Sequence, residues 1–160
     1  MGRRMPARLD ALDLKLLACL QQDNLQTADR LAEQVGRSPS AVARRLRRLR
    51  ATGAVAADVA LVSETAAGHP LSAVVHIQLE RHAPQEGDRL RRRLVASPHV
   101  QLCLDIAGAF DILLLVVARD MDDYNAFADA TLAEHPAVRR FESIFVKKRV
   151  KATLAVPLPA

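Results

Sequence analysis

The sequence predicts an α+β fold: an N-terminal helix-turn-helix, with or without a wing, followed by a ferredoxin-like βαββαβ sandwich. Apolar residues of the first third recur every three or four positions, whereas later segments alternate apolar and polar residues between helical stretches. A stretch of small residues with Gly68 and Pro70 separates the two patterns. We therefore expect a first domain over 1–53, a wing or linker strand over 54–70 and a second domain over 71–160.

The first part predicts three short helices. Leucines spaced by three and four residues indicate a helix over roughly 9–22. A second helix follows, with Thr27 as its N-cap and Gly36 at its end. Ser38 and Pro39 are a strong signal for the start of a third helix. Three short helices with a glycine turn before the third are typical of a helix-turn-helix.

The second part predicts four strands and two helices. The strands are expected around Val75–Glu80, at Val100–Ile106 with Val100, Leu102, Leu104 and Ile106 on one face, at Ile112–Ala118, and from Val138 to about Lys151. The helices are expected at Pro84–Ala96, with Leu90, Leu94 and Val95 facing inward, and at Asp120–Glu134, with Tyr124, Phe127, Ala128 and Leu132 at helical spacing. This βαββαβ order is the signature of a ferredoxin-like domain.

The strand at 112–118 is apolar on both faces. Two helices cover only one face of a four-stranded sheet, so the other face needs a second cover. A second copy of the same sheet is the simplest cover. We therefore expect a homodimer in which two sheets face each other.

Positive charge is concentrated near the N-terminus. The 160 residues carry 23 Lys and Arg against 18 Asp and Glu. Residues 1–62 hold 11 of the basic and 6 of the acidic residues, whereas residues 63–160 hold 12 of each. The net charge of +5 therefore lies entirely in the first part. A localised cationic surface predicts an anionic partner, with nucleic acid the leading candidate.

Several classes of protein are disfavoured. The chain is 50% hydrophobic and 26% charged, which predicts a folded core rather than disorder. The longest apolar run, 112–118, is too short to span a membrane. Residues 1–10 lack the apolar segment of a secretory signal, so we expect a cytoplasmic location and no membrane partner. Cys19 and Cys103 are isolated, which predicts buried thiols rather than a disulfide scaffold.

No pattern in the chain predicts catalysis or a cofactor. The five histidines are scattered without HxH or HxxxH spacing, so we expect no metal site. The phosphate-binding and nucleophile motifs GxxxxGK, GxGxxG and GxSxG do not occur. We therefore expect no cofactor and no enzymatic activity.

The third predicted helix is rich in arginine. Six arginines and no acid lie between Arg37 and Arg50. With Val42 directed toward the core, Leu46 and Leu49 fall within about 40° of it on a helical wheel. The helix is thus expected to bury an apolar stripe against its two neighbours and to expose a cationic face.

This cationic face predicts a DNA-reading surface. An exposed helix with arginines fits the major groove, where arginine binds guanine or phosphate. The helix N-terminus can also hold a phosphate. The candidate DNA contacts are Arg37, Ser38, Ser40, Ala41, Arg44, Arg45 and Arg48. A merely solvated basic surface is the alternative.

Several segments follow one another at a recognisable spacing. They are LDLKLL (12–17), LAEQVGRS (31–38), VARRLRRL (42–49) with Gly53, ALV (60–62) with Gly68, AGAFDILL (107–114), and VKATL (150–154) with Pro157 and Leu158. In this order they resemble the Lrp/AsnC family of transcriptional regulators along nearly the whole chain.

The resemblance implies an α/β-sandwich effector domain behind the DNA-binding domain, in dimers that assemble into octamers. It implies an amino-acid effector bound at contacts between dimers. Gly108, Phe110 and Asp111 would line that pocket, together with Ser143 from the last strand. Phe141 replaces a hydroxyl residue common in the family, which leaves open an apolar effector, another small molecule or none. Asp111 also fits a plain turn residue at a strand end.

These observations predict a sequence-specific regulator of transcription that binds double-stranded DNA and responds to a small effector. A sirohaem-decarboxylase-like enzyme of similar architecture is one alternative. It needs an aromatic-lined pocket with catalytic His and Arg, whereas this chain has no Trp and scattered histidines. An architectural DNA-binding protein without an effector is the other, and it would bind specific and random DNA about equally.

Overall fold

The computed structural model describes residues 9–80 and 84–159, which form two compact units. One unit holds the chain up to Ala60 together with the segment from Ala152, and the other holds Leu61–Lys151. The chain therefore passes from one unit to the other twice. Within the described ranges no helix has the length and apolar character needed to cross a bilayer.

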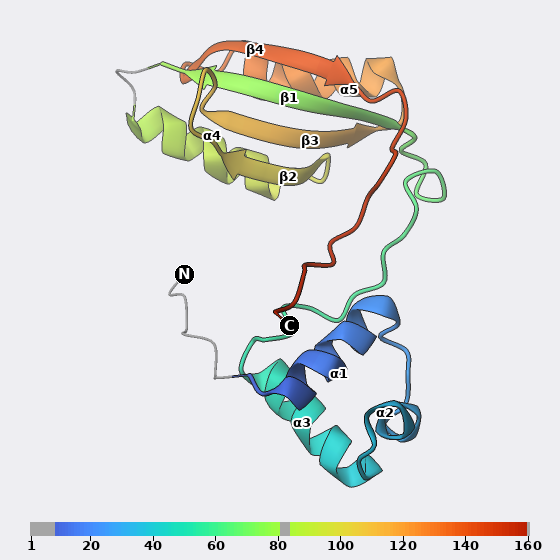
Figure 1. The fold of residues 1–160 in the computed structure, drawn as a ribbon. Helices are drawn as coiled ribbons and strands as arrows, with labels where there is room; N and C mark the ends of the chain where they lie inside the picture. The colour runs from blue at the N-terminus through green and yellow to red at the C-terminus, as the bar shows by residue number, and fades with distance from the viewer. Residues whose placement is uncertain (1–8, 81–83, 160) are drawn as a thin grey trace. The chain divides into compact units, whose positions relative to one another are not determined.

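Three helices form the first unit: α1 (Ala11–Gln22), α2 (Ala28–Val35) and α3 (Pro39–Ala51) (Figure 1). Each helix has an N-cap residue whose side chain accepts a hydrogen bond from a backbone N–H of the first turn. These N-cap residues are Asp10 for α1, Thr27 for α2 and Ser38 for α3. Gly36 ends α2 in the left-handed region, with φ of 64°, and so turns the chain into α3. The core of the unit consists of Leu16, Leu17, Leu31, Ala32, Val42, Leu46 and Leu49. The predicted helix-turn-helix is confirmed.

Residues 54–62 form no strand, which corrects the expectation for this segment. A strand needs a backbone partner, and the regular elements described in this unit are all helices. Ala54 and Val55 instead pack against the helical core. The Asp58 carboxylate accepts hydrogen bonds from Arg50 Nε at 2.7 Å and from Asn24 Nδ2 at 2.9 Å. Side-chain contacts therefore hold this segment.

The segment after Ala152 returns to the first unit. The Gln21 side-chain amide donates to the Val156 carbonyl at 3.0 Å and accepts from the Val156 N–H at 2.7 Å. Leu158 packs against the core of the three helices. The helix-turn-helix is thus completed by residues that follow the whole of the second unit in sequence.

We expect Gln21→Ala to lower the stability of the first unit by about 1 kcal/mol, because it removes both bonds to Val156. Thermal unfolding followed by circular dichroism would measure the change. Gln22→Ala is the matched control, since Gln22 is exposed at the next position of α1. Equal melting temperatures for the two variants would contradict a stabilising role for the returning segment.

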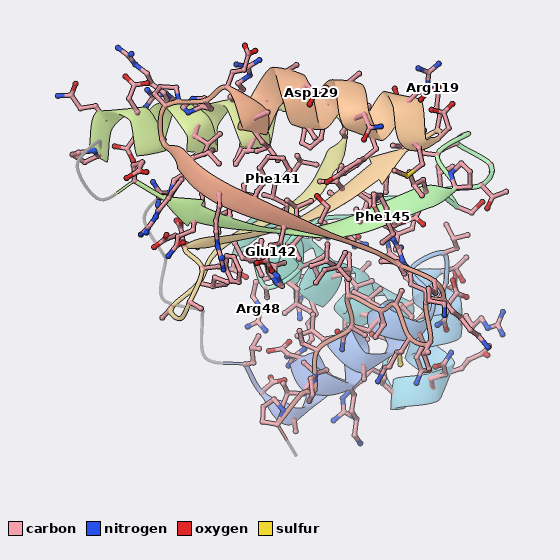
Figure 2. All side chains as sticks on the ribbon, turned by 90° about the horizontal axis from the view of Figure 1, so that it is seen from above. Arg48, Arg119, Asp129, Phe141, Glu142 and Phe145 are labelled. Atoms are coloured by element: carbon pink, nitrogen blue, oxygen red, sulfur yellow. The ribbon has the colours of Figure 1, made fainter. Side chains whose placement is uncertain are left out.

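The second unit is a sheet with two covering helices. Its elements are β1 (Leu71–Leu79), α4 (Pro84–Ala96), β2 (Val100–Asp105), β3 (Ile112–Ala118), α5 (Met121–Ala128) continued by the π-helical turn η1 (Asp129–Ala133), and β4 (Val138–Phe145). The strand order is β2-β3-β1-β4, and all neighbours are antiparallel. Both helices lie on the same face of the sheet (Figures 1 and 2). The predicted ferredoxin-like arrangement is confirmed.

The core lies between the sheet and its helices. Val75 and Ile77 of β1 and Leu114 of β3 are fully buried there, facing Leu90 and Leu94 of α4. The four apolar residues predicted for the second helix, Tyr124, Phe127, Ala128 and Leu132, are buried as expected. Val95 is 74% exposed, which corrects its predicted inward position. It follows Leu94 by about 100° around the helix and so points away from the sheet.

Strand β2 differs from its predicted pattern. The register with β3 shifts between Val100 and Leu102, so the alternation changes face within the strand. Val100 and Cys103 pack toward the core, whereas Leu102 and Leu104 are 42% and 43% exposed on the other face. The single apolar face expected for this strand is therefore wrong.

Strand β4 is shorter than predicted, ending at Phe145 rather than near Lys151. Its partner β1 begins at Leu71, and the last pairing is the bond from Val146 N–H to the Ser72 carbonyl at 2.9 Å. Beyond that point the described residues offer β4 no further strand to pair with.

The sheet face away from α4 and α5 is apolar in its middle. The register places Val74 of β1 beside Leu115 and Ile144, and places Leu102 and Leu104 of β2 beside Leu115 and Leu113 of β3. We call this surface the open sheet face; its residues are Val74, His76, Leu102, Leu104, Leu113, Leu115, Glu142 and Ile144. Ile144 is 53% exposed there. A contiguous group of exposed apolar side chains, unlike a single exposed leucine, indicates an interaction site.

Candidate nucleic-acid interface

Helix α3 buries one side and exposes the other. Val42, Leu46 and Leu49 lie in the core of the first unit. Arg44 and Arg47 are exposed on the other side. The ion pairs described within this unit involve Arg45, Arg48 and Arg50 but neither of these two residues. Arg44 and Arg47 are therefore available to an anionic partner.

Arg45 and Arg48 contact two acids at the start of α1. Arg45 Nη1 lies 2.5 Å from Asp10 Oδ2 and 2.9 Å from Asp13 Oδ1. Arg48, labelled in Figure 2, forms an ion pair with the other carboxylate oxygen of Asp13. The arginine side chains remain 30% and 46% exposed, whereas the Asp13 side chain is fully buried.

The ionisation of Asp13 reflects this environment. Burial alone would raise the pKa of the Asp13 carboxyl, but the Asp10 N–H and the two guanidinium groups donate to it and lower the pKa below its usual value. The pKa of Asp10 is also lowered, by the Asp13 N–H and by Arg45. Both acids are therefore charged at neutral pH, and the cluster of two acids and two arginines is neutral as a whole.

Neither acid was among the residues predicted from the sequence. The signal was present in α1, where Asp13 precedes Leu16, Leu17 and Leu20 by three, four and seven positions. An acid on the apolar stripe of a helix needs a cationic partner from another element. The arginine-rich α3 is the element that supplies it.

The start of α3 is exposed. The Ser38 hydroxyl accepts the Ala41 N–H at 3.4 Å and lies 3.4 Å from the Ser40 hydroxyl. Arg37 and Ser40 are exposed, and Ala41 is partly buried. Arg37 also donates to the Gly36 carbonyl at 3.0 Å. The structure thus brings the predicted DNA-contacting residues together on α3 and the turn before it.

Three of the predicted effector residues lie in the loop between β2 and β3, whereas Ser143 lies in β4. Asp111 precedes β3, and its Oδ2 accepts the Leu79 N–H at 2.7 Å. Its own N–H donates to the Ile77 carbonyl at 2.9 Å. The residue therefore closes the end of the sheet between β1 and β3, as the turn interpretation expects. Gly108 lies exposed in the loop before it.

Phe110 lies between two side chains of neighbouring strands. Its ring stacks on His76 with centroids 5.0 Å apart, and the Arg140 guanidinium carbon lies 5.2 Å from the ring centroid. Arg140 also pairs with Glu142 at 3.2 Å. This polar cluster borders the open sheet face, on the side of β4 where Figure 2 places Glu142.

Ser143 lies on the helix side of β4, where its hydroxyl hydrogen-bonds the Tyr124 hydroxyl. Phe145 contacts the Tyr124 ring edge-on, with centroids 5.1 Å apart. In the sheet, Ser143 lies opposite Val75 of β1, whereas Asp111 hydrogen-bonds Ile77 and Leu79 farther along the same strand. No described hydrogen bond joins Ser143 to the loop that holds Gly108, Phe110 and Asp111. Tyr124 was predicted only as a core residue.

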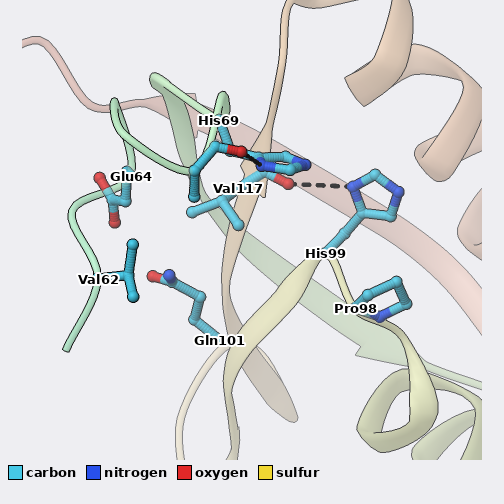
Figure 3. A pocket seen from close by; sticks show the side chains of 8 residues that line it. Val62, Glu64, His69, Pro98, His99, Gln101 and Val117 are labelled. Carbon is cyan, nitrogen blue, oxygen red and sulfur yellow. Dashed lines mark hydrogen bonds between the residues drawn. The ribbon is translucent and has the colours of Figure 1, made fainter. Parts of the chain in front are cut away.

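A shallow pocket lies elsewhere in the second unit (Figure 3). Its volume is about 290 Å³, and it is lined by Val62, Glu64, Ala67, His69, Pro98, His99, Gln101 and Val117. His69 and His99 each bond a backbone carbonyl through Nδ1, at 2.9 and 3.1 Å. None of the four predicted effector residues lines this pocket.

The thiols and histidines of the described ranges form no metal-binding group. No three of the His, Cys, Asp and Glu side chains described there gather in a metal-binding arrangement. Both cysteines are free and half-buried rather than fully buried. Desolvation and the nearby Asp105 raise the pKa of the Cys103 thiol, which disfavours the nucleophilic thiolate.

Comparison with known proteins places the chain in a family. Residues 9–55 match a winged helix-turn-helix DNA-binding family, and residues 72–156 match the Lrp/AsnC ligand-binding domain family. A regulator from Sinorhizobium fredii, described as an HTH-type transcriptional regulator, is 38% identical over 94% of this chain and 89% of its own length. The Bkd operon transcriptional regulator of Pseudomonas aeruginosa is 34% identical over 95% of this chain and 99% of its own length.

Solved structures agree with these matches. A transcriptional regulator from Neisseria meningitidis, solved in complex with L-Met, superposes with a TM-score of 0.89 at 31% identity, covering 94% of this chain and 97% of that one. An AsnC family regulator from Agrobacterium tumefaciens superposes with a TM-score of 0.87 at 28% identity, covering 93% and 97%. With the helix-turn-helix, the ferredoxin-like sheet and these matches together, the chain belongs to the Lrp/AsnC family of transcriptional regulators.

Proposed function

We propose that this chain regulates transcription by placing the arginine face of α3 in the major groove of double-stranded DNA. The observation that carries the proposal is a helix whose apolar stripe is buried in the first unit while Arg44 and Arg47 are exposed without ion pairs among the described residues. Arg37, Ser38, Ser40 and Ala41 are proposed to contact the DNA around the start of the helix, and Arg45 and Arg48 along its flank.

The proposed assembly is a homodimer formed through the open sheet face, with octamers as the larger form. The exposed leucines Leu102 and Leu104 and the exposed Ile144 support this, because a second sheet would remove them from water. Two helix-turn-helix units in a dimer read half-sites about one helical turn apart on DNA. We place the protein in the cytoplasm. The proposed role in transcription requires no catalytic step.

The proposed effector is a small molecule of the amino-acid class, bound near Gly108, Phe110 and Asp111, with Ser143 as a further residue of the site. Similarity to the Neisseria meningitidis regulator, which was solved with L-Met, supports this class. The second carboxylate oxygen of Asp111 accepts no described hydrogen bond, so it is the oxygen proposed to meet an ammonium group. The neighbouring Phe110 supplies an aromatic ring, and the Arg140 guanidinium supplies a cationic group beside that ring.

The arginine face can be tested directly. We expect the double variant Arg44→Ala with Arg47→Ala to weaken binding to a selected DNA duplex roughly a hundredfold, because each arginine contact is worth about 1–3 kcal/mol. If a lost contact is to a phosphate, the slope of the logarithm of the affinity against the logarithm of the salt concentration should become smaller by about one for each arginine removed. Fluorescence anisotropy at several salt concentrations would measure both quantities.

The matched control removes the same charge from the second unit. Arg92 and Arg139 are exposed on α4 and β4, and replacing both with Ala should leave the affinity for the selected duplex nearly unchanged. Equal losses for the two double variants would mean that net charge, and not the face of α3, determines binding. Equal wild-type affinities for selected and random duplexes would favour an architectural DNA-binding protein instead.

A further inference from the structure

Asp13 is the one fully buried acid among the described residues. It lies in the first turn of α1, and its carboxylate is reached by two arginines of α3. Oδ1 accepts from Arg45 Nη1 at 2.9 Å, and Oδ2 accepts from Arg48 Nη2 and from the Asp10 N–H at 3.0 Å. Both oxygens of the buried carboxylate are therefore satisfied, and each of them holds one arginine of α3.

Each arginine uses only part of its hydrogen-bonding capacity in this cluster. The described bonds of Arg45 are made by Nη1 alone, and that of Arg48 by Nη2 alone. A guanidinium carries five N–H donors in a rigid plane. Since the side chains are 30% and 46% exposed, each group keeps donors without a described partner, in a plane whose orientation the bond to Asp13 restricts.

The cluster of Asp10, Asp13, Arg45 and Arg48 does not increase the electrostatic attraction between the protein and DNA. Asp10 and Asp13 cancel the charge of Arg45 and Arg48, so the cluster adds no net charge to the cationic face. The two acids instead restrict the conformations of the Arg45 and Arg48 side chains. A free arginine side chain loses rotamer entropy when it is fixed, and here that loss is incurred during folding rather than during DNA binding.

We infer that Asp13 is a positioning residue for DNA recognition, holding the guanidinium planes of Arg45 and Arg48 in the orientation in which their outward N–H groups meet the DNA. This inference rests on the proposed function, in which α3 reads the duplex. It assigns the two kinds of arginine different roles. Arg44 and Arg47 supply net attraction, whereas Arg45 and Arg48 supply geometry and so contribute to discrimination between sequences.

The test uses the full chain and a duplex chosen by repeated selection from a randomised pool with the wild-type protein. Affinities for this duplex and for a shuffled duplex are measured for the wild type and for Asp13→Asn. A purely electrostatic view expects the variant to bind both duplexes more tightly, since a negative charge is removed from a DNA-binding unit. We expect the opposite for the selected duplex: about tenfold weaker binding, with shuffled-duplex binding equal or tighter.

The matched control is Asp29→Asn, which removes the same charge from the exposed first turn of α2. It should change both affinities in parallel and leave their ratio at the wild-type value. Asp10→Asn serves as the variant that keeps the fold, because asparagine is an equally good N-cap for α1 and Asp10 is half exposed. It removes one of the two carboxylates that Arg45 contacts and leaves the Asp13 contacts of Arg45 and Arg48 in place, so it should reduce the ratio by a smaller factor than Asp13→Asn.

Two results would overturn the inference. If Asp13→Asn and Asp10→Asn keep the wild-type ratio while the melting temperature falls, the cluster only staples α1 to α3. If both affinities rise together, the acids only mask charge. A wild-type protein that fails to prefer any selected duplex over the shuffled one would instead overturn the proposed function itself, so the two failures are distinguishable.

Discussion

Leu104→Asp is expected to dissociate the proposed dimer into folded monomers. Leu104 is 43% exposed in the single chain, so a carboxylate at this position still reaches water when the unit is alone. In a dimer built on the open sheet face the same carboxylate would be buried without a partner. Burial of an unpaired charge costs on the order of several kcal/mol, and an isologous interface carries the substitution twice.

The expected result is a dissociation constant raised roughly a thousandfold or more, since every 1.4 kcal/mol is about tenfold. Light scattering coupled to size-exclusion chromatography would measure the mass over a range of concentrations. Met121→Asp is the matched control: Met121 is 45% exposed at the start of α5, on the other face of the sheet, where an acid suits the helix N-terminus. A dimer that survives Leu104→Asp as well as Met121→Asp would show that the open sheet face is not the interface.

Leu31→Ala is expected to unfold the helix-turn-helix while the second unit stays folded. Leu31 is fully buried in α2, in a core of only seven buried residues. Truncation of a buried leucine to alanine costs about 2–5 kcal/mol. A unit of about 70 residues has little more stability than that to lose. DNA binding should therefore disappear, whereas association through the second unit should remain.

Thermal unfolding and hydrogen exchange would separate the two units, because amides of α1–α3 should lose protection and amides of β1 and β3 should keep it. Leu25→Ala is the control, since Leu25 is 92% exposed between α1 and α2 and its truncation should change neither unit. Loss of protection in both units of Leu31→Ala would mean that they unfold as one cooperative body.

Elements with strong local signals were predictable from the sequence. The cap residues Thr27 and Ser38 and the left-handed Gly36 determine where α2 and α3 begin and end, and each acts through its immediate neighbours. Strand β3 was predicted with its observed bounds, Ile112–Ala118, because an uninterrupted apolar run needs no pairing information to be recognised.

Features that depend on a second element were not predictable in the same way. The bulge between Val100 and Leu102 changes which face of β2 is buried, and it arises from pairing with β3 rather than from the composition of β2. The end of β4 depends on where β1 begins. Likewise, a wheel of α3 alone separates Arg44 from Leu46, but the difference between the exposed Arg44 and the paired Arg48 depends on Asp13 of α1.

The candidate effector residues illustrate the same limit. Asp111 was placed correctly at a turn, but its bond to the Leu79 N–H depends on the neighbouring strand β1. The hydroxyl pair of Ser143 and Tyr124 joins strand β4 to helix α5, so it depends on how the helix packs on the sheet. Spacing within one segment carries no information about either contact.

The return of the segment after Ala152 to the first three helices has a consequence for protein synthesis. A ribosome translating this chain makes Leu61–Lys151 before it reaches Leu158. At elongation rates of about 5–20 residues per second, that interval is on the order of ten seconds. During this time the nascent N-terminal helices lack the leucine that later packs on them and the backbone partner of Gln21. Full stability of the DNA-reading module is thus acquired only after translation of the sheet domain, so that operator binding depends on prior synthesis of that domain.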